Sequence, residues 1–422
     1  MSEADDSPDA SEKPRLRRDL RVLPAQAGGA QALVIQDPAG ILEKPMVIGG
    51  QALELLPLLD GRHSMVDLQT ELTRRYGILV SGDQVRKVLA KLDESYLLES
   101  PRYREALERT AREFAAGTFL PATHAGEAYP ADPDVLKGWA NGIISSAGGA
   151  ESGGDTVRAV VAPHIDPRVG GDVYGAAYAP LRGAEFDRVV ILGVGHSLRE
   201  GLIALTDKDV VTPLGTLTND REITAALRAR ADVVGAPDDL SFRGEHSVEF
   251  QAVLLQHVLG AADLKVVPLL MGAFEPLLED YERAGAIPGL DDLLAVLAEA
   301  AREPRTLLVA GVDMSHVGPK FGDELSSRAI APESEEHDKA LLEALCSRDP
   351  EAFWREGRRA GGRFNVCGFG ALACLLEVMP EGCSGRLAAY RTWHEEPTRS
   401  GVSFAAVTFS PSDPPDMPPA AP

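Results

Sequence analysis

The chain is short of cysteine, of basic charge and of long apolar runs, and each shortage excludes a class of protein. It has 4 cysteines in 422 residues and no CxxC pair, so a disulfide framework is not expected and a reducing compartment fits best. Lys and Arg number 42 against 64 Asp and Glu, and the net charge of -22 argues against a broad binding surface for nucleic acid or an anionic membrane. No run approaches the ~18 apolar residues of a membrane span, and the polar, acidic N-terminus lacks a signal-peptide core. We therefore expect a cytoplasmic protein.

Composition and hydrophobic pattern divide the chain into two expected domains with disordered ends. Residues 1–17 and 411–422 are rich in Pro, Asp, Ser and Ala, and we expect them to be disordered. Residues 18–100 predict a small α+β, winged-helix-like domain with two strands, three helices and a last strand at YLLES. Residues 101–117 predict a linker helix, and residues 118–410 form the main domain.

The small domain has no basic surface pattern. Residues 51–100 carry 6 Lys and Arg against 8 Asp and Glu, which disfavours DNA binding and favours a peptide-docking, protein-docking or purely structural role. The run LLDGRHSMVDLQTELTRRYG and the helix after it resemble PqqD-like peptide-recognition domains. The resemblance implies that this domain binds a peptide, but it transfers no site residue.

In the main domain, apolar strand-like runs alternate with amphipathic helical segments. Such alternation predicts an α/β fold with a central sheet sandwiched by helices. Several of the apolar runs stop on a polar side chain, and the ends of strands are where open α/β sheets place their chemistry.

Three of these strand ends carry candidate site residues. His164 ends VRAVVAPH, His196 follows RVVILGVG, and Asp313 and His316 follow RTLLVAGV. Each has a structural alternative: a histidine bonded to the backbone, a loop residue, or an aspartate that caps a turn. Because His196 follows His164 by about 30 residues, a single crossover could place the two strand ends side by side. Imidazole and carboxylate groups suit a metal site or general acid–base catalysis.

Two further segments add candidates. Glu245-His246-Ser247 precedes a helix, where it could face a pocket or serve only as a cap. Cys367 could be an inert core residue, or a soft ligand that favours iron, copper or zinc if it lies near the histidines. The remaining cysteines and His257 are expected to be structural, and His63, His124, His337 and His394 have no comparable setting.

Seven ordered motifs give a close resemblance to the Memo family over about residues 118–410. They are VAPHIDPRVGGDVYGAAY, ILGVGHS, TPLGTL, EHSVEFQAVLLQ, VVPLLMG, GVDMSH and NVCGFGAL. In bacteria this family is protein B of AmmeMemoRadiSam systems. The resemblance implies the fold of class III extradiol dioxygenases, with a mixed central sheet, and it implies radical-SAM and Amme proteins as partners.

The resemblance also implies a set of site residues. The metal ligands would be His164, His196 and Cys367, with iron as the first choice of metal and copper or zinc as alternatives. Asp313 and His316 would be acid–base groups. His246 would lie beside the pocket as a further catalytic residue.

The chain departs from the family pattern at two of these motifs. PHAGY reads PHIDP here, which introduces Asp166 and leaves Tyr174 as a nearby aromatic residue, and GPSH reads GVGH. A thiolate in place of the dioxygenase carboxylate changes the charge and softness of the ligand set, so ring cleavage is not carried over. The expected function is a metal-dependent redox enzyme, and the alternative is a non-catalytic peptide-binding adaptor. A hydrolase is disfavoured because the chain has no GxSxG motif.

Overall fold

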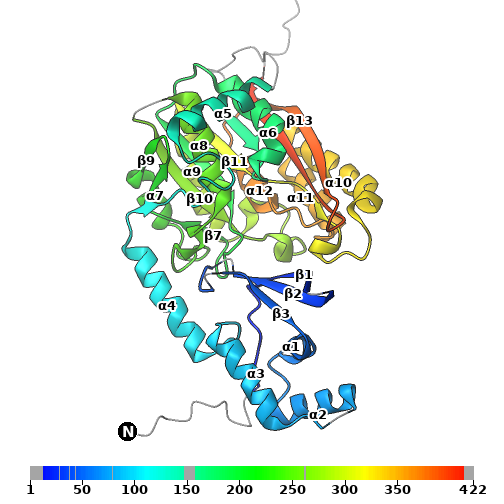
Figure 1. The fold of residues 1–422 in the computed structure, drawn as a ribbon. Coiled ribbons are helices and arrows are strands. Elements are labelled where there is room, and N and C mark those ends of the chain that lie inside the picture. Colours follow the sequence, from blue (N-terminus) through cyan, green and yellow to red (C-terminus); the bar gives the residue numbers. More distant parts are fainter. Residues whose placement is uncertain are drawn as a thin grey trace, which may run out of the picture. The chain divides into compact units, whose positions relative to one another are not determined.

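The computed structural model describes residues 13–412 except 28, 38, 43, 78, 147–156 and 261–262. The chain divides into two compact units, Met1–Ala116 and Gly117–Pro422 (Figure 1). Among the described residues, no helix is long and apolar enough to cross a membrane.

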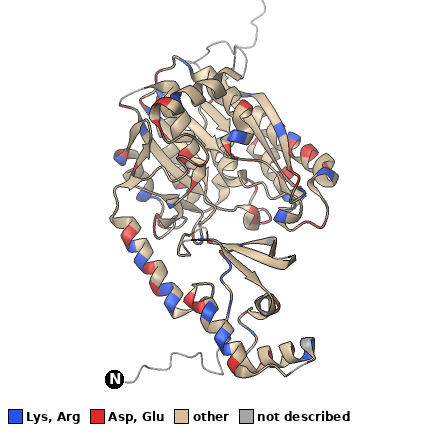
Figure 2. Ribbon diagram, viewed as in Figure 1, with Lys and Arg blue, Asp and Glu red and all other residues tan. Residues whose placement is uncertain are grey.

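The first unit is a three-stranded antiparallel sheet followed by helices. Its elements are β1 (Arg21–Ala27), β2 (Ala30–Gln36), β3 (Met46–Gly49), α1 (Gln51–Leu55), η1 (Leu56–Leu58), α2 (Met65–Tyr76), α3 (Gly82–Glu94) and α4 (Pro101–Ala116). Capping boxes at Ser64 and Ser81 start α2 and α3, and Gly77 ends α2 in the left-handed conformation. Basic and acidic residues are intermixed along α4 (Figure 2), as in the pair Glu108–Arg112.

The strand order of the first unit differs from the expectation. All three strands precede the helices. Strand β1 was not predicted, because the proline and glutamine within it are unusual in a strand. The expected strand YLLES is not formed. In this segment Leu98 makes only an isolated bridge with Leu16. The linker helix expected at 101–117 is α4, which belongs to the first unit.

The disorder expected over 1–17 does not extend to its last residues. Arg15 and Leu16 form isolated bridges, and Arg17 is 2% exposed. The Arg17 guanidinium donates to the carboxylates of Asp19 and Asp37, with an N–O distance of 2.8 Å to Asp37, and lies 4.0 Å from the Tyr103 ring centre. This neutralised, stacked cation holds the segment in place. Residues 1–12 and 413–422 lie outside the described residues.

The second unit contains an 11-stranded mixed sheet, as expected. Its strands are β4 (Phe119–Leu120), β5 (Ala159–Ala162), β6 (Arg188–Val194), β7 (Ile203–Leu205), β8 (Asp209–Thr212), β9 (Gly215–Asn219), β10 (Lys265–Met271), β11 (Thr306–Gly311), β12 (His316–Val317), β13 (Cys383–Glu395) and β14 (Ser400–Pro411). The main order is β12-β14-β5-β11-β6-β10-β9-β8-β4. Strands β5, β11, β6 and β10 run parallel to their neighbours in this series, and β14 pairs with β5 in the antiparallel sense.

Helices cover both faces of this sheet (Figure 1). They are α5 (Pro133–Ser146), α6 (Pro167–Tyr178), α7 (Arg221–Arg228), α8 (His246–Leu259), α9 (Leu290–Arg302), α10 (Ser327–Ser347), α11 (Pro350–Ala360) and α12 (Phe369–Val378). Helices α5, α6 and α8 contact one another, while α9 contacts α7 and α12. Every residue of β11 is buried, as expected for a strand covered on both sides.

The Arg17 interaction predicts a local loss of stability. Arg17→Ala leaves the buried carboxylate of Asp37 and the partly exposed carboxylate of Asp19 without their cation, and we expect it to lower the unfolding free energy of the first unit by about 3 kcal/mol. All three tryptophans lie in the second unit, at positions 139, 354 and 393. Circular dichroism should therefore show earlier unfolding of the first unit, whereas the unfolding of the second unit, followed by tryptophan fluorescence, should stay unchanged.

Arg86→Ala is the matched control. Arg86 pairs with Asp83 at the surface of α3, and we expect a loss of at most about 1 kcal/mol. Equal effects of the two substitutions would contradict the structural role given to Arg17.

Candidate metal centre

The site lies at the carboxyl ends of three neighbouring parallel strands. His164 follows β5, Asp313 follows β11 and His196 follows β6. The expectation that the strands of His164 and His196 are adjacent is wrong, because β11 pairs with both β5 and β6 and lies between them. Asp313 therefore lies between the two histidines in strand order.

The N-terminus of α8 completes the site. Glu245 is the N-cap and accepts from the Ser247 amide at 2.8 Å, so that His246 is the first residue of the helix. The Val194 amide at the end of β6 donates to Ser247 Oγ at 2.9 Å. Gly311 is needed here, because a Cβ at this position would lie 2.5 Å from the Ser247 carbonyl oxygen. Helix α8 can therefore start directly above the strand ends.

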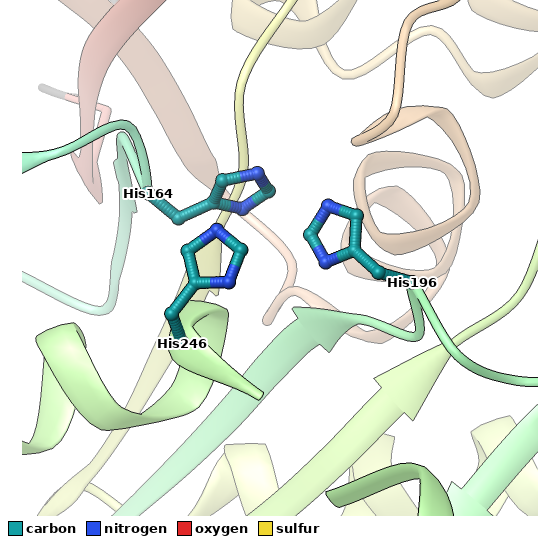
Figure 3. Close-up of side chains that lie close together, drawn as sticks. All are labelled: His164, His196 and His246. Carbon is teal, nitrogen blue, oxygen red and sulfur yellow. The ribbon is translucent and has the colours of Figure 1, made fainter. Parts of the chain in front are cut away.

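Three imidazole rings converge at this point (Figure 3). His164, His196 and His246 each offer a ligand atom, and these atoms all lie within 4.8 Å of one another. The ring centre of His164 lies 5.0 Å from that of His196 and 5.1 Å from that of His246. The rings of His196 and His246 are stacked, with their centres 4.9 Å apart. Sequence analysis placed His246 beside the pocket, and the structure places it in the histidine cluster itself.

His164 is held in one orientation and one protonation state. Its Nδ1 lies 2.9 Å from the Gly311 carbonyl oxygen, which can only accept, so Nδ1 carries the proton and Nε2 presents a lone pair. Asp313 Oδ1 accepts from the backbone amides of His164 and Ile165 at 3.0 and 3.2 Å. Burial lowers the pKa of His164 despite the opposing charge of Asp313. A neutral imidazole is the form that binds a metal.

Glu245 orients the other two rings. Its carboxylate lies 3.0 Å from His196 Nδ1 and 3.3 Å from His246 Nδ1. Burial favours the neutral acid, but the charge and hydrogen bond of His196, with smaller contributions from His246 and the Ser247 amide, outweigh it and hold the pKa of Glu245 below its usual range. Burial also lowers the pKa of His246 well below its usual value. A carboxylate that fixes Nδ1 and turns Nε2 to the centre is the usual support of a metal-binding histidine.

Cys367 joins the site from the turn before α12. Its Sγ lies 3.5 Å from His164 Nε2 and 3.6 Å from the carbonyl oxygen of Asp313. The two segments meet closely because the next residue is Gly368, where a Cβ would lie 2.5 Å from Val312 Cβ. Burial raises the pKa of the Cys367 thiol well above its usual range, and the nearby carboxylates add to the effect.

Asp313 and His316, the two acid–base candidates, are bonded to different parts of the backbone. His316 Nδ1 bonds to the Met314 carbonyl oxygen at 2.9 Å, and its ring packs on Phe321. Within the described part of the chain, no hydrogen bond joins His316 to the Asp313 carboxylate. Burial lowers the pKa of His316 to about 4, so this ring is neutral near pH 7.

Asp166, which the PHIDP departure introduces, and the nearby aromatic residue Tyr174 support the His164 loop from outside. Asp166 accepts from the Arg168 amide and caps α6. The buried Tyr174 donates from its hydroxyl to the Ile165 carbonyl oxygen at 3.0 Å. Both residues therefore hold the segment that carries His164.

His124 and Glu249 also adjoin the centre, and neither was predicted from the sequence as a site residue. His124 lies in a loop, and its ring centre is 5.8 Å from that of His246. Its Nδ1 is 2.9 Å from a carboxylate oxygen of Glu249 on α8. Burial disfavours the protonated ring, but the hydrogen bond and charge of Glu249 outweigh it and raise the pKa of His124. No periodic pattern surrounds His124, so nothing in the local sequence marked it.

Comparison with known proteins identifies the family of the chain. The family model described as Memo-like protein matches residues 121–408. A "MEMO1 family protein" of Aquifex aeolicus is 31% identical over 381 residues, which is 89% of this chain and 95% of the relative. One from Thermus thermophilus is 30% identical and covers 83% of this chain and 100% of the relative. "Protein memo-1 homolog" of Caenorhabditis elegans is 29% identical over 266 residues, 61% of this chain and 70% of the relative.

The match to the Aquifex protein is longer than the whole second unit, so it extends into the first. The family model alone covers most of the chain, including every strand end and turn that supplies a side chain to the centre. The chain therefore belongs to the Memo family.

Proposed function

We propose that this protein is a metal-dependent redox enzyme that binds one transition-metal ion through His164, His196, His246 and Cys367. The observation that carries the proposal is the convergence of three imidazole ligand atoms within 4.8 Å of one another, with a sulfur 3.5 Å from one of them. Two nitrogens bound to one ion at ~2.1 Å are at most ~4.2 Å apart, so small ring movements suffice to close the site.

The surroundings of the four side chains fit a bound cation. The Gly311 carbonyl oxygen and Glu245 fix the Nδ1 atoms, and Asp313 and Glu245 bring negative charge next to the rings. Nitrogen and sulfur donors together favour iron, copper or zinc over magnesium or calcium. We propose iron as the resident metal, because the four donors leave coordination positions for a substrate.

The bound ion supplies one-electron chemistry and Lewis acidity. The chain's own residues position it: Glu245 holds two rings, Gly311 holds a third, and Asp313 holds the backbone of the His164 loop. His316 is neutral near pH 7 with Nδ1 bonded to the Met314 carbonyl oxygen, and we propose that its Nε2 accepts a hydrogen bond from the bound substrate as part of the acid–base machinery.

We also propose a setting for this activity. The motif order supports membership of an AmmeMemoRadiSam system, in which radical-SAM and Amme proteins are the partners. Free cysteines, with no disulfide among the described residues, support a cytoplasmic location. The PqqD-like pattern supports peptide binding by the first unit.

Metal analysis of protein purified anaerobically tests the proposal. We expect about one iron per chain in the wild type, and less than a tenth of that in His164→Ala and in His196→Ala, because each variant removes a ligand. His257→Ala serves as control, since His257 bonds to Asn141 near the other end of α8. Metal-free wild-type protein, or equal loading in all variants, would contradict the proposal and favour the adaptor role.

Proton release tests the sulfur ligand separately. The raised pKa keeps the Cys367 thiol protonated at pH 7.5, whereas a metal binds the thiolate, so binding must release that proton. We expect the wild type to release about one proton more per ion than Cys367→Ser, measured by calorimetry in buffers of different ionisation enthalpy. Equal proton release would remove Cys367 from the ligand set and leave the three histidines.

Glu245→Gln tests the support of the rings. An amide lacks the negative charge that orients His196 and His246, and we expect metal affinity to fall about 10- to 100-fold. Competition with a chelator measures the affinity, and thermal unfolding checks the fold. Glu303→Gln is the control, because Glu303 pairs with Arg188 away from the site. An unchanged affinity in Glu245→Gln would show that the carboxylate serves only to cap α8.

A further inference from the structure

The chain segment that carries the Cys367 sulfur lies beside the segment that carries Asp313 and His316. At one end of this pair of segments, the His316 amide donates to the Phe364 carbonyl oxygen at 2.8 Å. At the other end, the Cys367 Sγ lies 3.6 Å from the Asp313 carbonyl oxygen. The place of the sulfur therefore depends on the conformation of residues 364–368, which we call the cysteine turn.

Asn365 gives the cysteine turn its direction. Its φ is 46°, in the left-handed region, which few residues other than glycine adopt. Asparagine visits this region more readily than most residues, because its short polar side chain can form local hydrogen bonds. Since Asn365 lies two positions before Cys367, a change in its backbone angles moves the sulfur. Among the described residues, the non-glycine residues with a positive φ are Tyr96, Arg348, Asn365 and Arg399.

The side chain of Asn365 adds a second attachment. Its Nδ2 donates to the His316 carbonyl oxygen at 3.3 Å, while the neighbouring Phe364 carbonyl oxygen accepts from the His316 amide. Both peptide groups that flank the His316 side chain are therefore bonded to the cysteine turn. Asn365 is exposed, so it does not stabilise the core by burial. Unfavourable backbone conformations cluster at functional sites, which makes a role in the adjoining centre the better explanation.

The sulfur is already at a ligand's distance from one histidine. The Cys367 Sγ lies 3.5 Å from His164 Nε2, and sulfur and nitrogen ligands of one tetrahedral ion are ~3.6 Å apart. The rings of the centre come from strand ends and from α8, whereas the sulfur comes from an irregular turn. Because no helix or strand fixes this turn, its own residues must hold the sulfur in place.

We propose that Asn365 is a positioning residue of the metal centre, whose left-handed backbone holds the Cys367 sulfur towards the three histidine rings. The inference rests on the proposed function and deepens it, because it names the residue that makes the sulfur available as a fourth ligand. The amide bond to His316 attaches the same turn to the proposed acid–base residue. A single exposed asparagine thus links the ligand sulfur to His316.

Co²⁺ binding to the full-length protein tests the inference, because a cobalt–thiolate bond gives a charge-transfer band in the near ultraviolet that cobalt–imidazole bonds lack. Asn365→Val opposes the left-handed backbone, since β-branched residues avoid a positive φ, whereas Asn365→Gly permits it and removes only the amide bond. We expect the band per bound Co²⁺ to fall at least about threefold in Asn365→Val and to stay near the wild-type value in Asn365→Gly. The three histidines are unchanged, so the Co²⁺ content at saturation should be equal in all variants.

Arg399→Val is the matched control. Arg399 is also exposed and has a φ of 56°, but it lies in the turn between β13 and β14, so this variant should keep the wild-type band. Cys367→Ser gives the absorbance of a centre without sulfur. Thermal unfolding checks the fold of each variant, and Asn365→Ala, whose smaller side chain also disfavours a positive φ, replaces Asn365→Val if the latter does not fold.

Three outcomes would overturn the inference while the metal function stands. They are a wild-type band in Asn365→Val, equal losses in Asn365→Val and Arg399→Val, and a loss in Asn365→Gly as large as that in Asn365→Val. Cobalt-loaded wild type with the spectrum of Cys367→Ser would remove the sulfur from the ligand set, and this inference with it, but would leave the three histidines. A wild-type protein that binds neither Co²⁺ nor iron would instead remove the proposed function itself.

Discussion

The carboxylate of Glu245 is the interaction on which the site depends. It caps α8 through the Ser247 amide, and it lies within hydrogen-bond distance of His196 Nδ1 and 3.3 Å from His246 Nδ1. A helix N-terminus favours a negative charge, and so do two imidazoles. One ionised, buried group thus fixes the start of a helix and the orientation of two rings from different elements. Without it, the stacked pair of rings would have no common support.

Helix α8 extends this control over three other segments. Ser247 binds the end of β6, Glu249 binds the loop at 123–129, and Gln251 donates to the Pro163 carbonyl oxygen at 2.9 Å, next to His164. These partners are far apart in sequence and meet only along the first two turns of α8. The accuracy of the centre is therefore set by the register of one helix against the sheet, and small residues in the strands, such as Gly311, permit that register.

The sequence was sufficient for the sheet class and for the strand-end residues. The apolar runs before His164, His196 and Asp313 are long and end abruptly, so both the strands and the polar residues after them could be predicted. Strand order could not, because the insertion of β11 between β5 and β6 is decided by packing over the whole unit. For the same reason β1 was missed, since its sequence RVLPAQA becomes a strand only by pairing with β2.

The other site residues show where local patterns stop being informative. A lone cysteine such as Cys367 reads equally well as an inert core residue or as a soft ligand, and the family resemblance decided between the two. From the sequence, His246 could be either a pocket residue or part of a helix cap. In the structure it follows the capping residue Glu245 and belongs to the histidine cluster. His124 lies in an irregular loop, and its place depends on Glu249 more than 100 positions later in the chain.

The burial of Cys367 has a consequence for how the protein withstands oxidation. Peroxides and disulfides attack thiolates rather than thiols, so a sulfur kept protonated by its surroundings is slow to become sulfenic acid or a mixed disulfide. Without a bound metal, the Cys367 sulfur is therefore held in its protonated, less reactive form. A cation that bound this sulfur as a thiolate would end that protection, and the filled centre would be open to oxidants.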